Sequence, residues 1–131
     1  MTGITIQEVV LDCTDPAALA AFWGRLLECG WGSLDDNWAV VHASPLMGFQ
    51  RVPEAKSSPK NRLHLDIQVD DITAAIERAE ALGAHTLGDP NFGTEGGFQV
   101  MLDPEDNEFC LVSDPAGTWH RALLASITNL P

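Results

Sequence analysis

The most restrictive feature of this 131-residue sequence is an internal repeat. In each half, an apolar strand is followed by a helix that begins at an aspartate, and then by three further strands. Glu8 lies seven residues before Asp15 and His64 lies seven residues before Asp71, so both members of the second pair are 56 positions further on. Self-similarity of this kind is typical of duplicated supersecondary units. The sequence therefore predicts an α+β fold of two paired βαβββ modules whose sheets form a half-barrel cleft.

The first module is predicted over residues 1–53. Ile4–Leu11 is rich in β-branched residues, which favours a strand. Asp15 followed by Pro16 is typical of a helix start, and Gly30 and Gly32 are expected to end that helix. Its apolar residues recur at helical spacing, at Leu19, Phe22, Trp23, Leu26 and Leu27. The module is completed by short strands around Trp31, over Trp38–Ala43 and over Leu46–Val52.

The second module is predicted over residues 62–114, after a polar linker at 54–61. Leu63–Val69 alternates strictly between apolar and polar residues, as a half-buried strand does. Asp71 is expected to cap a helix that Gly83 stops. Further strands are expected at His85–Leu87, Phe98–Leu102 and Glu108–Val112, the last two joined by a turn at Asp103–Asn107.

Charge and cysteine content narrow the partners and the compartment. The chain has 7 Lys and Arg against 19 Asp and Glu, a net charge of −12. A surface this negative repels phosphate backbones and anionic lipids, so neither nucleic acid nor a membrane is expected as a partner. No apolar stretch is long enough to span a bilayer. The cysteines, Cys13, Cys29 and Cys110, form no CxxC pair, which favours free thiols in the cytoplasm.

Strand alternation predicts which side chains face the cleft. If Leu63, Leu65 and Ile67 pack on the helices, the side chains of the opposite face point inward: His64, Asp66 and Gln68. The repeat places Glu8 on the matching face of the first strand. Alternation turns Cys110 inward on the last strand of the second module, and the repeat places Gln50 in the corresponding position of the first module. The inward set of carboxylate, amide, imidazole and thiol consists of residue types that ligate divalent metals: Glu8, Gln50, His64 and Cys110.

Each of these residues also has a structural interpretation. His64 could be a core histidine bonded to Asp66 or Glu8, and Cys110 could be a small buried apolar residue. The aromatic side chains either pack in the core or line a ligand pocket, and this applies to Trp31, Trp38, Phe49 and Phe98. Asp66, Gln68, Phe49 and Trp38 are the candidate substrate-binding residues, and Glu8 and His64 are the candidate catalytic residues.

Three segments resemble the vicinal oxygen chelate superfamily: DCTDPAALAAFW, NRLHLDIQVDDITAAIERAEALGA and FQVMLDPEDNEFCLV. This superfamily includes glyoxalase I, bleomycin-resistance proteins, fosfomycin-resistance enzymes and extradiol dioxygenases, and the likeness is greatest to its small glyoxalase-like domain branch. The resemblance covers Ile4 to Asp114 and implies metal ligands at Glu8, Gln50, His64 and Cys110. The sequence departs from the family at Cys110, where glutamate is typical, and at Asp106, where glycine is usual. Aspartate tolerates the left-handed conformation, so the turn is expected to form.

The resemblance implies a small molecule bound in the cleft and leaves the function class open. One alternative is a lyase, isomerase or dioxygenase that depends on a divalent metal (Zn, Fe, Ni or Mn), with Glu8 and His64 in catalytic roles. Another is a protein without a cofactor that sequesters a drug, for which the negative charge suits a cationic ligand. A third is an interaction protein whose tail, residues 115–131, forms a helix and docks on a partner or on a second copy in a homodimer.

Overall fold

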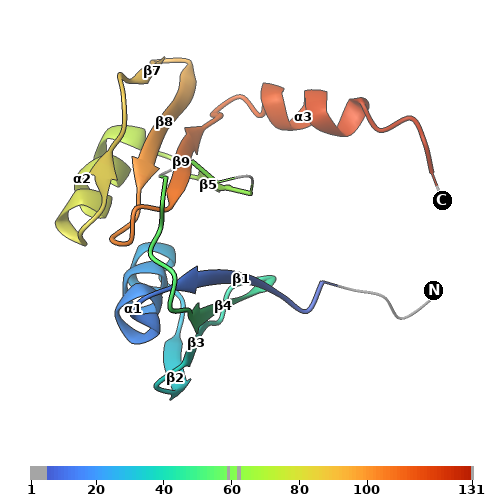
Figure 1. The fold of residues 1–131 in the computed structure, drawn as a ribbon. Coiled ribbons are helices and arrows are strands. Elements are labelled where there is room, and N and C mark those ends of the chain that lie inside the picture. The colour runs from blue at the N-terminus through green and yellow to red at the C-terminus, as the bar shows by residue number, and fades with distance from the viewer. Residues whose placement is uncertain (1–5, 59, 62, 131) are drawn as a thin grey trace. The chain divides into compact units, whose positions relative to one another are not determined.

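The computed structural model describes residues 6–58, 60–61 and 63–130. The chain forms two compact units, which Figure 1 shows and which are described one at a time. Unit 1 comprises Met1–Pro59 together with Asp103–Asn107, and unit 2 comprises Lys60–Leu102 together with Glu108–Pro131. Eight positions of the predicted segments lie outside the described residues: residues 1–5 of the first module, which include the strand start at Ile4, linker residue Pro59, Arg62 at the start of the second module, and Pro131 at the end of the tail.

Unit 1 is a four-stranded sheet with helix α1 (Pro16–Leu27) packed on one face. The strand order is β1–β4–β3–β2, in which β1 pairs with β4 in parallel and the other neighbours are antiparallel. The strands are β1 (Glu8–Cys13), β2 (Trp31–Asp35), β3 (Trp38–Val41) and β4 (Leu46–Arg51).

Helix α1 begins where the sequence predicts and ends earlier than predicted. The Asp15 side chain accepts a hydrogen bond from the Ala18 N–H at 3.2 Å, and Pro16 occupies the first turn. The helix ends at Leu27 because Glu28 adopts the left-handed conformation, with φ of 56°. The predicted stop at Gly30 and Gly32 is therefore wrong by a few residues.

The turn that belongs to unit 1 is organised around a buried carboxylate. Asp103 is fully buried and accepts a hydrogen bond from the indole N–H of Trp23 at 3.1 Å. It also accepts bonds from the backbone N–H groups of Glu105 and Asn107, both at 2.9 Å. Asp106 takes a left-handed φ of 64°, which confirms the expectation that aspartate can replace glycine there.

Unit 2 repeats the arrangement of unit 1. Its strand order is β5–β9–β8–β6 with β5 parallel to β9, and an additional strand, β7, pairs with β8. This common topology confirms the predicted α+β fold of two βαβββ modules, whereas β7 was not predicted. The elements are β5 (Leu65–Gln68), α2 (Ile72–Ala81), β6 (His85–Thr86), β7 (Asn91–Gly93), β8 (Gly96–Leu102), β9 (Glu108–Ser113) and α3 (Thr118–Ala125).

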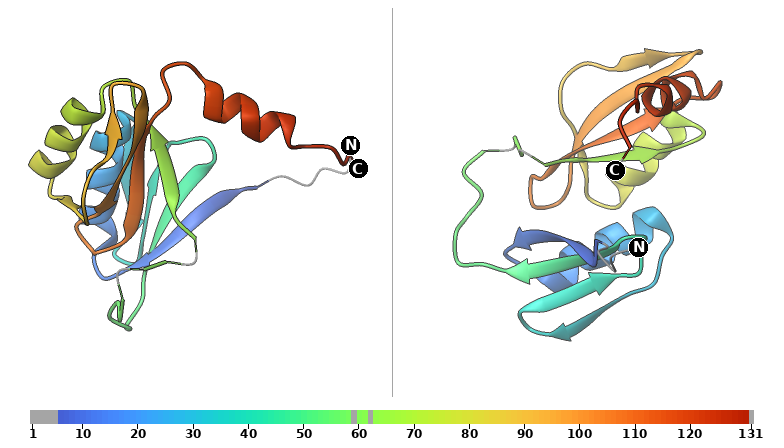
Figure 2. Two further views of the ribbon diagram at one scale, coloured as in Figure 1. Left: turned by 90° about the horizontal axis from the view of Figure 1, so that it is seen from above. Right: turned by 90° about the vertical axis from the view of Figure 1, so that its right-hand side faces the viewer.

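The two faces of the unit 2 sheet have different partners. Met101, Phe109 and Leu111 are fully buried on the face that α2 covers. The views in Figure 2 show α2 and α3 on opposite sides of this sheet. The prediction that Leu63 packs on the helix face is wrong: its side chain is 68% exposed, because it precedes β5, which begins at Leu65. Among the described residues, neither α1, α2 nor α3 has the length and apolar character needed to cross a bilayer.

Candidate functional site

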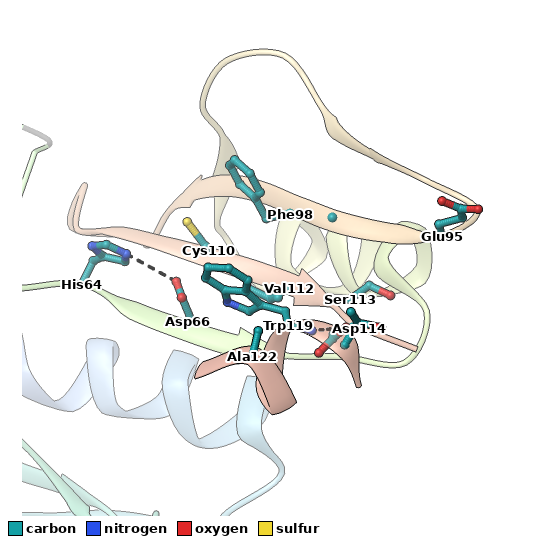
Figure 3. A pocket seen from close by; sticks show the side chains of 12 residues that line it. His64, Asp66, Glu95, Phe98, Cys110, Val112, Ser113, Asp114, Trp119 and Ala122 are labelled. Atoms are coloured by element: carbon teal, nitrogen blue, oxygen red, sulfur yellow. Dashed lines mark hydrogen bonds and ion pairs between the residues drawn. The ribbon is translucent and has the colours of Figure 1, made fainter. Parts of the chain in front are cut away.

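A cavity of about 650 Å³ lies on the face of the unit 2 sheet opposite α2. Residues of β8 and β9 form much of its wall, Asp66 of β5 contributes at one side, and α3 closes another side. Figure 3 shows His64, Asp66 and Cys110 grouped toward one end and Glu95 at the other end. We refer to this cavity as the unit 2 pocket, and to His64, Asp66 and Cys110 together as its polar group.

Strand register brings the polar group together. Asp66 of β5 pairs with Cys110 of β9, so their side chains lie on the same face of the sheet. His64 lies two residues before Asp66, and its Nε2 is 3.4 Å from Asp66 Oδ1. One ligand atom from each of His64, Asp66 and Cys110 lies within 4.8 Å of the others. Two of the four predicted metal ligands, His64 and Cys110, are therefore close together, with Asp66 as the third donor.

The Cys110 thiol is neutral in this environment. Burial raises its pKa above the ordinary value, and the negative charges of Asp66 and Glu108 raise it further. A free thiol of this kind is a poor nucleophile, because the thiolate is the reactive species. Cys110 therefore serves either as a neutral wall of the pocket or as a ligand to a metal that displaces its proton.

Two aromatic side chains from separate elements line the pocket. Phe98 of β8 is 43% exposed and Trp119 of α3 is 61% exposed. The start of α3 is fixed by Asp114, whose carboxylate oxygens accept hydrogen bonds from the backbone N–H groups of Trp119 at 3.3 Å and His120 at 3.0 Å. This cap holds the first turn of α3 beside β9, which places the Trp119 indole along the pocket (Figure 3).

Glycine at position 96 is required for this arrangement. Gly96 has a φ of 109°, and a Cβ there would lie 2.4 Å from the backbone oxygen of Ser113. The close approach of β8 to the end of β9 therefore depends on the absence of a side chain. β9 ends at Ser113, and Asp114 begins the connection to α3, so this contact helps to set where that connection starts.

The other predicted site residues of unit 2 and unit 1 occupy different environments. Gln68 is exposed on the same sheet face as Asp66, two residues further along β5. In unit 1, Glu8 and Trp38 are neighbours across Gly48: a Cβ at Gly48 would lie 3.0 Å from Glu8 Oε2 and 3.0 Å from Trp38 Cζ2. Phe49 is fully buried on the opposite face of the same strand, which favours a core role for its ring over ligand contact.

The structure does not bring Glu8 and Gln50 together. In the parallel pairing of β1 and β4, Glu8 lies opposite Leu46 and Gln50 lies opposite Asp12. Four register positions correspond to roughly 13 Å along a strand. Ligand distances to a divalent metal are only about 2.0–2.3 Å. Glu8 and Gln50 are therefore not placed to ligate one ion within unit 1, although they share a sheet face.

Trp119, Asp114 and Glu95 were missed as candidate site residues in the sequence. The available signal was the segment that starts at Asp114, in which an aspartate and Gly117 precede an apolar tail, a pattern that can begin a helix. The pattern predicts a helix in the tail, but it carries no information on which surface that helix covers.

Residues 8–112 match a family model described as glyoxalase-like domain. This match spans most of the chain, and the protein belongs to the glyoxalase-like domain family, within the vicinal oxygen chelate superfamily. No curated protein compared with the chain matches it.

Solved structures with low sequence identity share the fold. A glyoxalase/bleomycin resistance protein/dioxygenase family enzyme from Burkholderia phytofirmans PsJN has a TM-score of 0.68 at 18% identity, covering 82% of this chain and 96% of its own. The bleomycin-binding protein from bleomycin-producing Streptomyces verticillus, complexed with copper(II)-bleomycin, has a TM-score of 0.59 at 18% identity, covering 86% and 98%. A genomically encoded fosfomycin resistance protein from Listeria monocytogenes has a TM-score of 0.66 at 15% identity, covering 86% and 91%.

Proposed function

We propose that the protein binds a small organic molecule in the unit 2 pocket. The observation that carries this proposal is that one cavity of about 650 Å³ combines two exposed aromatic rings with a cluster of three polar groups. Ligand sites of proteins are typically apolar cavities of about 300–1,000 Å³ with a few convergent polar groups. Covering the exposed part of a large aromatic side chain recovers about 1 kcal/mol of hydrophobic free energy, so a ligand with an apolar body gains affinity at Phe98 and Trp119.

The donor chemistry of the polar group fits a zinc ion. His64, Asp66 and Cys110 offer nitrogen, oxygen and sulfur, all of which zinc accepts, whereas magnesium and calcium prefer oxygen alone. Zinc–ligand distances of about 2.0–2.3 Å put neighbouring tetrahedral donors roughly 3.3–3.8 Å apart. The 3.4 Å between His64 and Asp66 already meets this spacing, and Cys110 lies within the 4.8 Å limit of the group.

Three protein ligands would leave one position for a substrate atom, as in catalytic zinc sites. A zinc ion bound there would supply Lewis acidity toward a substrate oxygen. Because zinc has no redox chemistry, this donor set supports a lyase or isomerase in preference to a dioxygenase. His64, Asp66 and Cys110 would hold the ion, while Phe98 and Trp119 would position the apolar part of the substrate. The acid–base role of Glu8 and the ligand role of Gln50 stay predictions from the sequence.

Sequestration without catalysis is the second candidate function. The aromatic character of the pocket favours it, because the exposed rings of Phe98 and Trp119 offer contact area to a ligand but no acid, base or nucleophile. The two candidates differ in their metal requirement: a sequestering protein keeps its affinity for the organic ligand after chelation of metal ions. We also propose that the protein acts in the cytoplasm, because its three cysteines are free thiols, and the homodimer stays a prediction that a sizing measurement would check.

The pocket is tested by filling it. Ala122 of α3 lines the pocket, whereas Ala125 lies on the same helix and is exposed outside it. In a thermal-shift screen of small organic compounds, binding raises the Tm by mass action. We expect compounds that stabilise the wild type and Ala125→Trp but do not stabilise Ala122→Trp. Compounds that stabilise both variants equally, or a screen in which none stabilises the wild type, would contradict the proposal.

The metal site is tested by zinc titration with isothermal calorimetry. We expect one equivalent of zinc to bind to the wild type and binding to be lost in His64→Ala and Cys110→Ser. His85→Ala is the matched control, because His85 is exposed on β6 and does not line the pocket. Unchanged zinc binding in His64→Ala, or equal loss in His85→Ala, would exclude the metal site while leaving the organic ligand to the pocket-filling test.

A further inference from the structure

We propose that the ligand of the unit 2 pocket is a planar aromatic cation. This inference rests on the proposed function, since it requires that the pocket bind a small organic molecule, and it adds the charge and shape of that molecule. Three features of the molecule point to this ligand: the ionisable groups along the wall, the positions of the two aromatic rings, and the charge of the whole chain.

The charged groups of the pocket wall are acidic. Asp66, Glu95 and Asp114 line the pocket together with His64, and no lysine or arginine is among the lining residues within the described part of the chain. The basic side chains near these elements have partners: Lys60 forms a 3.0 Å ion pair with Glu108, and Arg121 donates a 2.8 Å hydrogen bond to the Ala116 carbonyl.

The acidic character persists if zinc is bound. A zinc ion with one carboxylate and one thiolate as ligands makes a neutral group, so Asp66 and Cys110 would no longer attract a cation. Glu95 and Asp114 would keep their negative charges outside that group. Figure 3 shows Glu95 at the end of the pocket away from His64, so the acidic end is separate from the metal donors. The net charge of −12 adds a long-range attraction for cations.

The aromatic rings define the shape of the ligand. Phe98 extends from β8 and Trp119 from α3, so they approach the pocket from different elements (Figure 3). The faces of aromatic rings attract cations, indole most strongly, and they stack on planar ring systems. A flat ligand whose ring system carries a delocalised positive charge uses both kinds of contact and leaves its charge near carboxylates.

The test compares two tricyclic dyes that differ in charge. At neutral pH, 9-aminoacridine is a cation and acridine is uncharged, while their ring systems are the same. Dissociation constants are measured by fluorescence titration of the full-length protein without added metal. We expect the cation to bind the wild type about tenfold more tightly than acridine.

Paired variants assign the preference to the pocket. Trp119→Ala is expected to weaken binding of 9-aminoacridine about tenfold, whereas Leu123→Ala, an exposed residue of the same helix outside the pocket, leaves it unchanged. Glu95→Gln is expected to weaken the cation about threefold and acridine not at all. Glu80→Gln, an exposed residue of α2, is the charge-matched control and is expected to change neither.

The outcomes separate this inference from the proposed function. Equal affinity for the two dyes, or binding of 9-aminoacridine that is unaffected by Trp119→Ala, would overturn the cation inference. If acridine binds and Ala122→Trp abolishes its binding, the pocket still takes an organic ligand and only its preferred charge is different. If neither dye binds, the cation inference fails, and the compound screen decides separately whether the pocket binds any organic molecule.

Discussion

Replacing Asp103 by asparagine tests the account of the buried turn. Every polar neighbour of the carboxylate is a donor. Oδ1 accepts bonds from Glu105 N, Asn107 N and Asn107 Nδ2, and Oδ2 accepts bonds from Trp23 Nε1 and Asn107 Nδ2. Asparagine must present an NH₂ group where one oxygen lies. The smallest loss results when that group replaces Oδ2, which leaves the buried indole N–H of Trp23 facing another donor.

The size of the effect follows from this lost acceptor. A buried donor without a partner costs about 1–3 kcal/mol. Asparagine removes a buried charge, which offsets part of this cost, and we expect Asp103→Asn to lower the free energy of unfolding by about 2 kcal/mol. The measurement is urea unfolding followed by far-ultraviolet circular dichroism. The matched control is Asp106→Asn in the same turn, which changes an exposed residue that keeps its left-handed φ and costs less than about 0.5 kcal/mol.

A double-mutant cycle isolates the bond between Trp23 and Asp103. Trp23→Phe removes the indole donor, so Asp103→Asn should cost about 1 kcal/mol less in that background than in the wild type. Equal stability of Asp103→Asn and Asp106→Asn would contradict the predicted loss of an acceptor. Simple additivity of the costs of Trp23→Phe and Asp103→Asn would also contradict it.

Three further predictions concern pH, thiol reactivity and helix capping. Burial raises the pKa of Asp103 above 3.8, so the folded protein binds more protons than the unfolded chain just above that pH. The difference in free energy of unfolding between the wild type and Asp103→Asn should therefore shrink as pH rises through the folded pKa. A difference that widens with rising pH would contradict this. Burial raises the pKa of Cys13 to about 12, so its thiol is rarely ionised at about pH 8. Iodoacetamide at that pH should modify the partly exposed Cys29 at least about 100-fold faster than it modifies Cys13, as measured by mass spectrometry. Equal rates would show that the Cys13 site opens readily. Asp71 accepts a 3.1 Å hydrogen bond from Ala74 N, so Asp71→Ala should destabilise the protein by about 1 kcal/mol in urea unfolding, and an equal loss from Asp70→Ala would speak against the cap.

Local sequence patterns predict the elements because their causes are local. Asp15 and Asp71 identify both helix starts, since a capping side chain bonds an N–H only three residues ahead. Period-two alternation likewise places His64 and Asp66 on one face. The same alternation in the last strand, with Phe109 and Leu111 toward the helix, predicts that Cys110 faces the other way, and the register of β5 with β9 places it on the face of Asp66.

Features that depend on distant parts of the chain could not be predicted in this way. The Glu105 carboxylate accepts a hydrogen bond from the Thr14 hydroxyl, 91 positions away, and no periodicity encodes that pairing. The predicted site with Glu8 includes Gln50 because the repeat makes Gln50 the counterpart of Cys110, and the repeat gives the strand and the face of a residue more surely than its position along the strand. Trp119 was missed for a similar reason: its sequence neighbours predict a helix, whereas its role depends on the surface that α3 covers.

The most direct test of the unit 2 pocket is a titration of the protein with 9-aminoacridine, followed through its indole N–H signals by ¹H–¹⁵N NMR. The sequence has four tryptophans, Trp23, Trp31, Trp38 and Trp119, and single replacements by phenylalanine assign their signals. A ligand in the pocket should move the Trp119 signal and leave that of the buried Trp23 unchanged. Saturable binding of the dye with an unmoved Trp119 signal would show that the ligand site is elsewhere.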